Sequence, residues 1–194
     1  MQVDEDPLDG AVPSSHRVPS GDAAAAARIM IEFCNTRGLE ETGPIEGDGA
    51  CLFRAAAVQL SMADSQHAQL THLDVRQACV EWVIDEYGRS ETDTLQQIGY
   101  RDWADWRAQM SQPQHYGDEL CVEAIAAVYR VRVQLVFILN AVSPCSIRVV
   151  GDDDDELPTI YLGCVGDHHF HSLRPIQRLS DPPKVRRKRA KSKK

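Results

Sequence analysis

Apolar residues recur every three or four positions through the first part of the chain, a spacing typical of helices with one buried face. The pattern predicts helices over residues 22–37, 51–62, 73–87, 91–110 and 119–129. Asp22 and Asp118 stand where the first and last of these helices would begin, and an aspartate there can accept hydrogen bonds from unpaired N–H groups. Gly38 and Gly88 would end two of the helices. We expect residues 39–47 to form a loop.

After residue 130 the spacing changes to an alternation of apolar and polar positions, which is typical of strands. Residues 131–139 show it most clearly, with apolar side chains at every second position. Further strands are predicted over residues 145–150, 159–165 and 169–174. Helices that precede strands in this way favour an α+β fold, in which helices pack on a mostly antiparallel sheet.

Three segments differ in composition. Residues 1–20 contain three prolines and no apolar periodicity, so we expect this segment to be disordered. We expect residues 21–178 to form one domain, followed by a basic, flexible tail over residues 179–194. Residues 184–194 hold eight Lys or Arg residues and no acid. Because the whole chain carries a formal charge of −8, the remaining residues 1–183 carry about −16.

This division of charge bears on partners. An acidic domain is expected to repel nucleic acid and to suit a partner with a basic surface. The tail itself could act as a nuclear import signal, as an arm that contacts nucleic acid or an anionic membrane, or as a solvated terminus. The expected location is therefore the cytoplasm, the nucleus or both, and nucleic acid is expected only as a partner of the tail.

Other classes of protein are disfavoured by what the sequence lacks. No apolar run approaches the roughly 20 residues that span a membrane, and no secretory signal is expected. The six cysteines include no CxxC pair, which favours reduced thiols in a reducing compartment. The absence of CxxC and HxxxH spacing also argues against a zinc site, and we expect no metal and no cofactor.

Cys51 is the candidate nucleophile. A glycine-rich turn, Glu-Gly-Asp-Gly at residues 46–49, leads into the helix predicted to begin at this cysteine. Unpaired N–H groups at a helix N-terminus favour an anion, so the thiol is expected to ionise below its usual pKa of roughly 8.5. The same N–H groups could hold an oxyanion. The alternative is a structural cysteine that packs as a small apolar side chain.

A cysteine nucleophile requires a base, and histidines gather in residues 166–173. In an extended strand, His169 and His171 face one side, whereas His168 and Phe170 face the other. Three neighbouring histidines in extended geometry cannot all point at one metal ion, so a base is favoured over a metal ligand. The alternative is a solvated strand edge.

Three stretches resemble motifs of the OTU (ovarian tumour) family of cysteine proteases. Residues 48–55, Asp-Gly-Ala-Cys-Leu-Phe-Arg-Ala, resemble the family signature D-G-N-C-L-F-R-A. Residues 169–175, His-Phe-His-Ser-Leu-Arg-Pro, resemble the closing motif H-Y-x-S-x-R. Between them, Met110-Ser111 and residues 116–120 resemble the segment M-S-x-x-G-x-W-G-D-x-x-x-L. The resemblance spans roughly residues 40–176.

This resemblance implies a papain-like cysteine protease fold of OTU type and a deubiquitinase. The family cleaves the isopeptide or peptide bond at the C-terminus of ubiquitin or a ubiquitin-like modifier, through a thioester on the cysteine. By resemblance, Cys51 is the nucleophile and His169 the general base and acid. Asp48 is either an acid that orients His169 or a residue of the turn. The backbone N–H groups of Gly49, Ala50 and Cys51 would bind the oxyanion, and the partners would be ubiquitin, polyubiquitin and ubiquitinated proteins.

The chain departs from the family pattern at three positions. Ala50 replaces the common Asn and Tyr116 replaces Trp, and neither change removes a backbone N–H. His171 stands two residues after the base, where many members have the Asn or Asp that orients the imidazole. The orienting group in this chain is therefore left open between Asp48, Asp167, His171 and a residue from elsewhere.

Two alternatives follow from these departures. The chain could be a catalytically weak ubiquitin-binding module, or a protease for another ubiquitin-like modifier. The motifs do not specify a preference among ubiquitin linkages.

Overall fold

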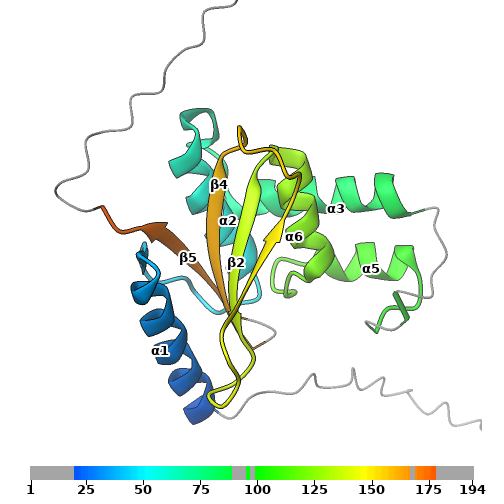
Figure 1. Ribbon diagram of the computed structural model, residues 1–194. Helices are drawn as coiled ribbons and strands as arrows, with labels where there is room; N and C mark the ends of the chain where they lie inside the picture. The colour runs from blue at the N-terminus through cyan, green and yellow to red at the C-terminus, as the bar shows by residue number, and fades with distance from the viewer. Residues whose placement is uncertain (1–19, 89–94, 97–98, 167–168, 178–194) are drawn as a thin grey trace, which may run out of the picture.

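The computed structural model describes residues 20–88, 95–96, 99–166 and 169–177. Within this part of the chain, helices cover both faces of a five-stranded sheet (Figure 1). The helices are α1 (Ser20–Thr36), α2 (Cys51–Ala63), the short 3₁₀ helix η1 (Ser65–His67), α3 (His72–Tyr87), α5 (Trp103–Met110) and α6 (Glu119–Tyr129). The strands are β1 (Leu39–Glu41), β2 (Arg132–Ile138), β3 (Ser146–Val150), β4 (Thr159–Val165) and β5 (His169–Pro175).

The strands lie in the order β1-β5-β4-β2-β3. Three neighbouring pairs are antiparallel, β1 with β5, β5 with β4, and β2 with β3, whereas β2 and β4 are parallel. The predicted α+β arrangement with a mostly antiparallel sheet is therefore confirmed. The predicted disordered segment, apart from Ser20, and the tail 179–194 lie outside the described residues.

The core is divided by the sheet. One cluster joins α2, α3 and α6 to the sheet through residues such as Val133 and Ile160. The other joins α1 to the opposite face, where Met30 and Cys34 pack against Val136 and Ile138. Both faces of β2 are thus covered, although its sequence alternates as a one-sided strand would.

The predicted helices at 51–62, 73–87 and 119–129 are confirmed within one residue at each end. Asp118 caps α6 as predicted, because its carboxylate accepts a hydrogen bond from the Cys121 N–H at 3.1 Å. The prediction for Asp22 was wrong. The helix α1 already begins at Ser20, and the Asp22 carboxylate accepts a hydrogen bond from the Ala141 N–H across the fold.

The single helix predicted over residues 91–110 was also wrong. Gly99 has φ +95°, a left-handed conformation that a helix cannot continue through. Asp102 then caps a new helix, α5, by accepting a hydrogen bond from the Asp105 N–H at 2.8 Å. The predicted helix thus contains a break that apolar spacing alone did not reveal.

The segment predicted as a loop over residues 39–47 contains the strand β1. This strand has three residues, too few to show an alternating pattern. It pairs with the far end of β5, so that Glu41 lies opposite Leu173. The pairing brings a carboxylate from the N-terminal part of the chain beside the histidines of β5.

Candidate active site

The loop before α2 is held in a conformation that only glycine allows at Gly49. This residue has φ +85°, and a Cβ added there would lie 1.8 Å from the carbonyl oxygen of Gln114. Any side chain would therefore collide with backbone as well as strain the turn. The loop consequently fits tightly against residues 110–117 and delivers Cys51 as the first residue of α2.

Cys51 is fully buried. Hydrogen bonds from the backbone of Phe170, Leu52 and Cys51 itself lower the pKa of its thiol, but burial has the larger effect and raises that pKa above 9.0. The expectation of a readily ionised thiol was therefore wrong, because removal from water outweighs the helix N-terminus. The Cys51 thiol is therefore neutral near pH 7.

His169 is the first residue of β5, directly before the Phe170 backbone that reaches the Cys51 thiol. Cys51 and His169, 118 residues apart in the sequence (169 − 51), are thus connected through the Phe170 backbone where α2 begins. A Cβ added at Gly47 would lie 3.3 Å from His169 Nδ1, so the loop backs the ring closely. Burial, followed by the neighbouring His171, lowers the pKa of His169 from 6.5. The ring is neutral near pH 7 and can accept a proton.

His171 lies on the same side of β5 as His169, as the alternation predicts. The two ring centroids are 4.5 Å apart and the ring planes cross at 84°. His171 is 9% exposed, and its Nδ1 lies 2.6 Å from Glu41 Oε1. Sequence reasoning did not single out Glu41, and only its allowance for an orienting residue from elsewhere covers this carboxylate.

Asp48 makes the contacts of a turn residue. One carboxylate oxygen accepts a hydrogen bond from the Ala50 N–H at 3.1 Å, and the other lies 2.5 Å from the Arg54 guanidinium. The hydrogen bond from Arg54 lowers the pKa of Asp48 to about 2. These contacts favour the turn role over orientation of His169.

The same contacts bear on the predicted oxyanion donors. The Ala50 N–H is already bonded to Asp48, and the backbone of Cys51 lowers the pKa of its own thiol. Asp167, another predicted orienting residue, lies outside the described residues.

Arg76 of α3 holds the site together, and sequence reasoning missed it. Its guanidinium lies 4.1 Å from the centre of the Phe53 ring and is almost completely buried. It donates hydrogen bonds to the backbone carbonyls of Gly49, Met110, Pro113 and His115. The Gly49 bond ties the loop before Cys51 to the segment after α5. An arginine within a helical pattern carries no sequence signal for such a role.

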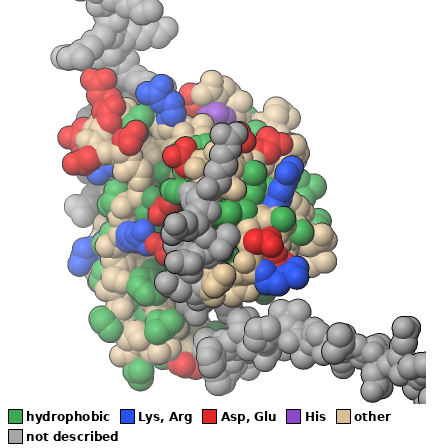
Figure 2. Space-filling model, turned by 90° about the vertical axis from the view of Figure 1, so that its right-hand side faces the viewer, with side chains coloured by type: hydrophobic (Ala, Val, Ile, Leu, Met, Phe, Trp, Pro, Cys, Tyr) green, Lys and Arg blue, Asp and Glu red, His purple; other side chains and the backbone are tan. Residues whose placement is uncertain are grey.

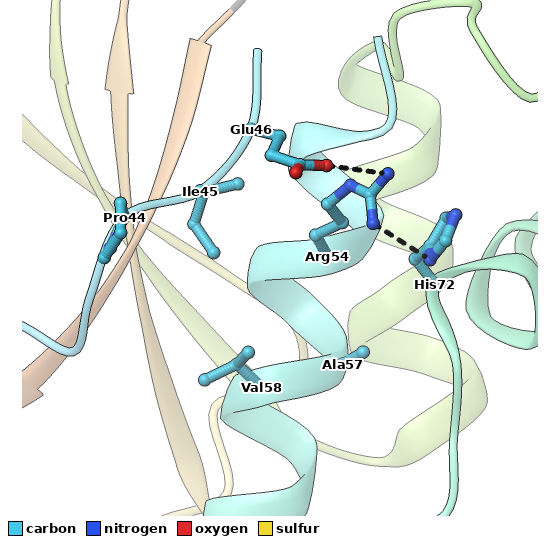
Figure 3. A pocket seen from close by; sticks show the side chains of 7 residues that line it. All are labelled: Pro44, Ile45, Glu46, Arg54, Ala57, Val58 and His72. Atoms are coloured by element: carbon cyan, nitrogen blue, oxygen red, sulfur yellow. Dashed lines mark hydrogen bonds and ion pairs between the residues drawn. The ribbon is translucent and has the colours of Figure 1, made fainter. Parts of the chain in front are cut away.

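A pocket of about 380 Å³ lies beside the loop, on the outer side of α2 (Figure 3). Arg54 crosses it, with Glu46 at 3.3 Å and His72 Nδ1 at 3.5 Å. The rest of the lining comes from Pro44, Ile45, Ala57 and Val58. Cys51 and His169 do not line this pocket, so it is a neighbouring feature rather than the reaction centre.

The described residues contain no group of three or more His, Cys, Asp or Glu side chains placed to hold a metal ion. None of the six cysteines, all of which are described, forms a disulfide. No helix in the described part of the chain is long and apolar enough to cross a membrane.

Comparison with known proteins gives consistent results. Residues 46–170 match the sequence model of a family described as OTU-like cysteine protease. The chain is 28% identical over 168 residues to the protein named Putative ubiquitin thioesterase L96 of Tipula iridescent virus, covering 82% of this chain and 19% of that protein. It is 24% identical over 183 residues to OVARIAN TUMOR DOMAIN-containing deubiquitinating enzyme 10 of Arabidopsis thaliana, covering 94% and 46%. The chain thus spans less than half of either relative.

Solved structures share the fold. The OTU domain of OTUD1 matches with a TM-score of 0.60 at 18% identity, over 78% of this chain and 96% of that domain. An OTU deubiquitinase from Wolbachia pipientis wMel, solved with ubiquitin bound, matches with a TM-score of 0.52 at 15% identity, over 72% and 98%.

Proposed function

Because the chain belongs to the family of OTU-like cysteine proteases, we propose that it is a deubiquitinase in which Cys51 is the nucleophile and His169 the general base and acid. The observation that carries this assignment is the hydrogen bond from the Phe170 backbone to the Cys51 thiol. This bond supports the assignment because Phe170 directly follows His169, whose pKa is lowered so that its ring is neutral near pH 7. The OTU fold and the names of the two curated relatives support ubiquitin as the modifier.

The proposed reaction begins from a neutral thiol and a neutral imidazole. His169 takes the thiol proton as Cys51 Sγ attacks the carbonyl carbon at the C-terminus of ubiquitin. The tetrahedral intermediate collapses when His169 gives that proton to the leaving amine, and a thioester remains on Cys51. His169 then takes a proton from water, which attacks the thioester, and the proton returns to the thiol as ubiquitin leaves with a free carboxylate.

The oxyanion would be held by backbone N–H groups at the start of α2. Of the three predicted donors, Ala50 would have to exchange the Asp48 carboxylate for the substrate oxygen. Ubiquitin, polyubiquitin and ubiquitinated proteins are the proposed partners. The cytoplasm and the nucleus are the proposed locations, and the basic run in residues 184–194 is what supports nuclear import.

Hydrolysis of a fluorogenic ubiquitin C-terminal amide tests the proposal. In reducing buffer without added metal, the wild-type chain should turn the substrate over, and Cys51→Ala should reduce the rate to the buffer background. Cys145→Ala is the matched control, because this partly exposed cysteine directly precedes β3, the edge strand that β2 and β4 separate from β5. Retained activity in a folded Cys51→Ala variant would contradict the assignment.

A ubiquitin probe with a C-terminal electrophile separates the enzyme from a ubiquitin-binding module. The enzyme should form a covalent adduct at Cys51, whereas a module that only binds should not. The same probe built on other ubiquitin-like modifiers would identify a different preferred modifier.

A further inference from the structure

A partly buried carboxylate–histidine pair lies directly beside the proposed base. Glu41 Oε1 and His171 Nδ1 are 2.6 Å apart. A carboxylate can only accept, so the ring must carry its proton on Nδ1 and donate it to Glu41. The contact joins β1 to β5 between residues 130 positions apart in the sequence. It is a tertiary contact that the sheet pairing creates, not a local one.

The second ring nitrogen of His171, Nε2, indicates how the Glu41–His171 pair could act on its surroundings. His171 Nε2 is buried and has no hydrogen-bond partner within the described part of the chain. With Nδ1 protonated for Glu41, a neutral His171 carries a lone pair on Nε2. A buried acceptor without a partner costs free energy, so an unused lone pair beside another titratable ring calls for an explanation.

The neighbour that can use this lone pair is His169, whose ring contacts His171 nearly at a right angle with centroids 4.5 Å apart. On β4, the positions opposite His169 and His171 are Val165 and Gly163, neither of which can titrate. Met30 of α1 closes the space over Gly163, where an added Cβ would lie 2.8 Å from its methyl group. Neither of the two β4 positions opposite His169 and His171 therefore carries a charge that could interact with the two rings.

The titratable groups that remain near the two rings come from three other elements. Glu41 comes from β1. Cys34 comes from α1, and the charge of Glu41 raises the pKa of the Cys34 thiol, after the larger effects of burial and of Cys145. Cys51 comes from α2, and Asp48, in the loop before α2, acts electrostatically on Cys51. Glu41 is the member of this set that is hydrogen-bonded to His171 and also favours the protonated form of His169.

We propose that Glu41 is a positioning residue for His169, acting through His171, in the hydrolysis proposed above. Glu41 fixes the tautomer and the orientation of His171, and His171 in turn holds the imidazole of His169. When His169 receives the Cys51 proton it becomes a cation, and the charge of Glu41 then favours that cation. The carboxylate thus enters the site from β1, through an intervening histidine.

Steady-state kinetics of Glu41→Gln with the fluorogenic ubiquitin amide test the proposal. The neutral amide keeps the size of the side chain but removes its charge. We expect kcat to fall about ten- to a hundredfold with little change in KM, because orientation of the base is lost rather than substrate binding. The acid limb of kcat/KM should also move to lower pH, because Glu41 raises the pKa of His169.

Glu40→Gln is the matched control. Glu40 is the preceding residue of the same strand, but its carboxylate pairs at 2.8 Å with Arg174, a side chain that is 49% exposed. This variant should keep the wild-type kcat and pH profile. An equal effect of both substitutions would mean that Glu41 merely stabilises the strand pairing and would overturn the proposal.

A double-mutant cycle with His171→Asn tests whether Glu41 acts through the second ring. An Asn amide at this position can accept directly from His169, so Glu41→Gln should cost much less in that background than in the wild type. Additive effects would show that Glu41 acts without His171, against the proposal.

A readout without ubiquitin keeps this inference separate from the proposed function. The rate at which iodoacetamide alkylates Cys51, followed on its own peptide by mass spectrometry, reports the Cys51–His169 pair as pH varies. Glu41→Gln should shift the acid limb of that rate downward, and Glu40→Gln should not. If the wild type cleaves no ubiquitin substrate, the deubiquitinase proposal fails, and the alkylation profiles still decide for or against the role of Glu41.

Discussion

The protonation states of two residues define how the proposed site works. Burial raises the pKa of the Cys51 thiol and lowers the pKa of the His169 imidazole. Both shifts favour the uncharged form, so the proposed site holds a neutral pair rather than a thiolate–imidazolium pair before substrate binds. The base must therefore remove the proton during attack, which makes its orientation important for the rate.

This neutral pair predicts the pH dependence of kcat/KM. Activity requires unprotonated His169, whose pKa is lowered from 6.5, so the acid limb should fall below pH 6.5. Because the pKa of Cys51 lies above 9.0, no second rise is expected between neutral pH and pH 9. The profile is measured with the fluorogenic amide, after preincubation at each pH to exclude unfolding. An activity rise near pH 8–9 would indicate a thiolate nucleophile instead.

At the scale of single residues, the sequence predicted the chemistry of the proposed nucleophile and base but not their environment. The glycine-rich turn and the alternation of β5 are local, so the positions of Cys51 and His169 could be predicted. Burial and the Glu41 contact depend on strands that meet only in the fold. The pKa of Cys51 was therefore predicted in the wrong direction.

At the scale of elements, Arg76 links α3, the loop before α2 and the segment after α5. Its guanidinium donates hydrogen bonds to backbone carbonyls of segments that are not paired with one another as strands. Elements with strong periodicity, such as α2 and α6, were predicted within one residue. The three-residue β1 and the break at Gly99 were not, because neither produces a period.

Replacing Arg76 by Met should destabilise the fold by about 3 kcal/mol, because several buried carbonyls would lose a charged donor. Urea unfolding followed by circular dichroism measures this loss. Arg101→Met is the control, since that side chain is 84% exposed and pairs with Asp105 one turn along. Its loss should stay below about 0.5 kcal/mol. If the two variants were equally stable, the role assigned to Arg76 would be wrong.

At the scale of the whole molecule, charge is spread unevenly. Figure 2 shows one face, on which acidic side chains form several groups with basic and apolar side chains between them. The connector over residues 152–156 is acidic throughout and exposed, and its Asp155 pairs with Arg132 at 2.9 Å. Such a domain should attract basic partners over distances set by the salt concentration.

Deleting residues 184–194 should leave kcat for the ubiquitin amide unchanged, because no proposed catalytic residue lies there. KM should rise with added salt in both chains, since screening weakens attraction between the acidic domain and a basic substrate. A full-length chain with its eight tail Lys and Arg residues changed to Gln controls for length. Loss of turnover on deletion would favour a function carried by the tail.

The burial of Cys51 has a consequence for redox damage. Peroxide converts thiolates to sulfenic acid far faster than it converts thiols, and access to the sulfur limits the reaction further. A resting thiol that is fully buried, with its pKa above 9.0, presents little of the reactive form to an oxidant. This site should therefore persist in its reduced form under oxidative stress that would inactivate an enzyme with a preformed thiolate.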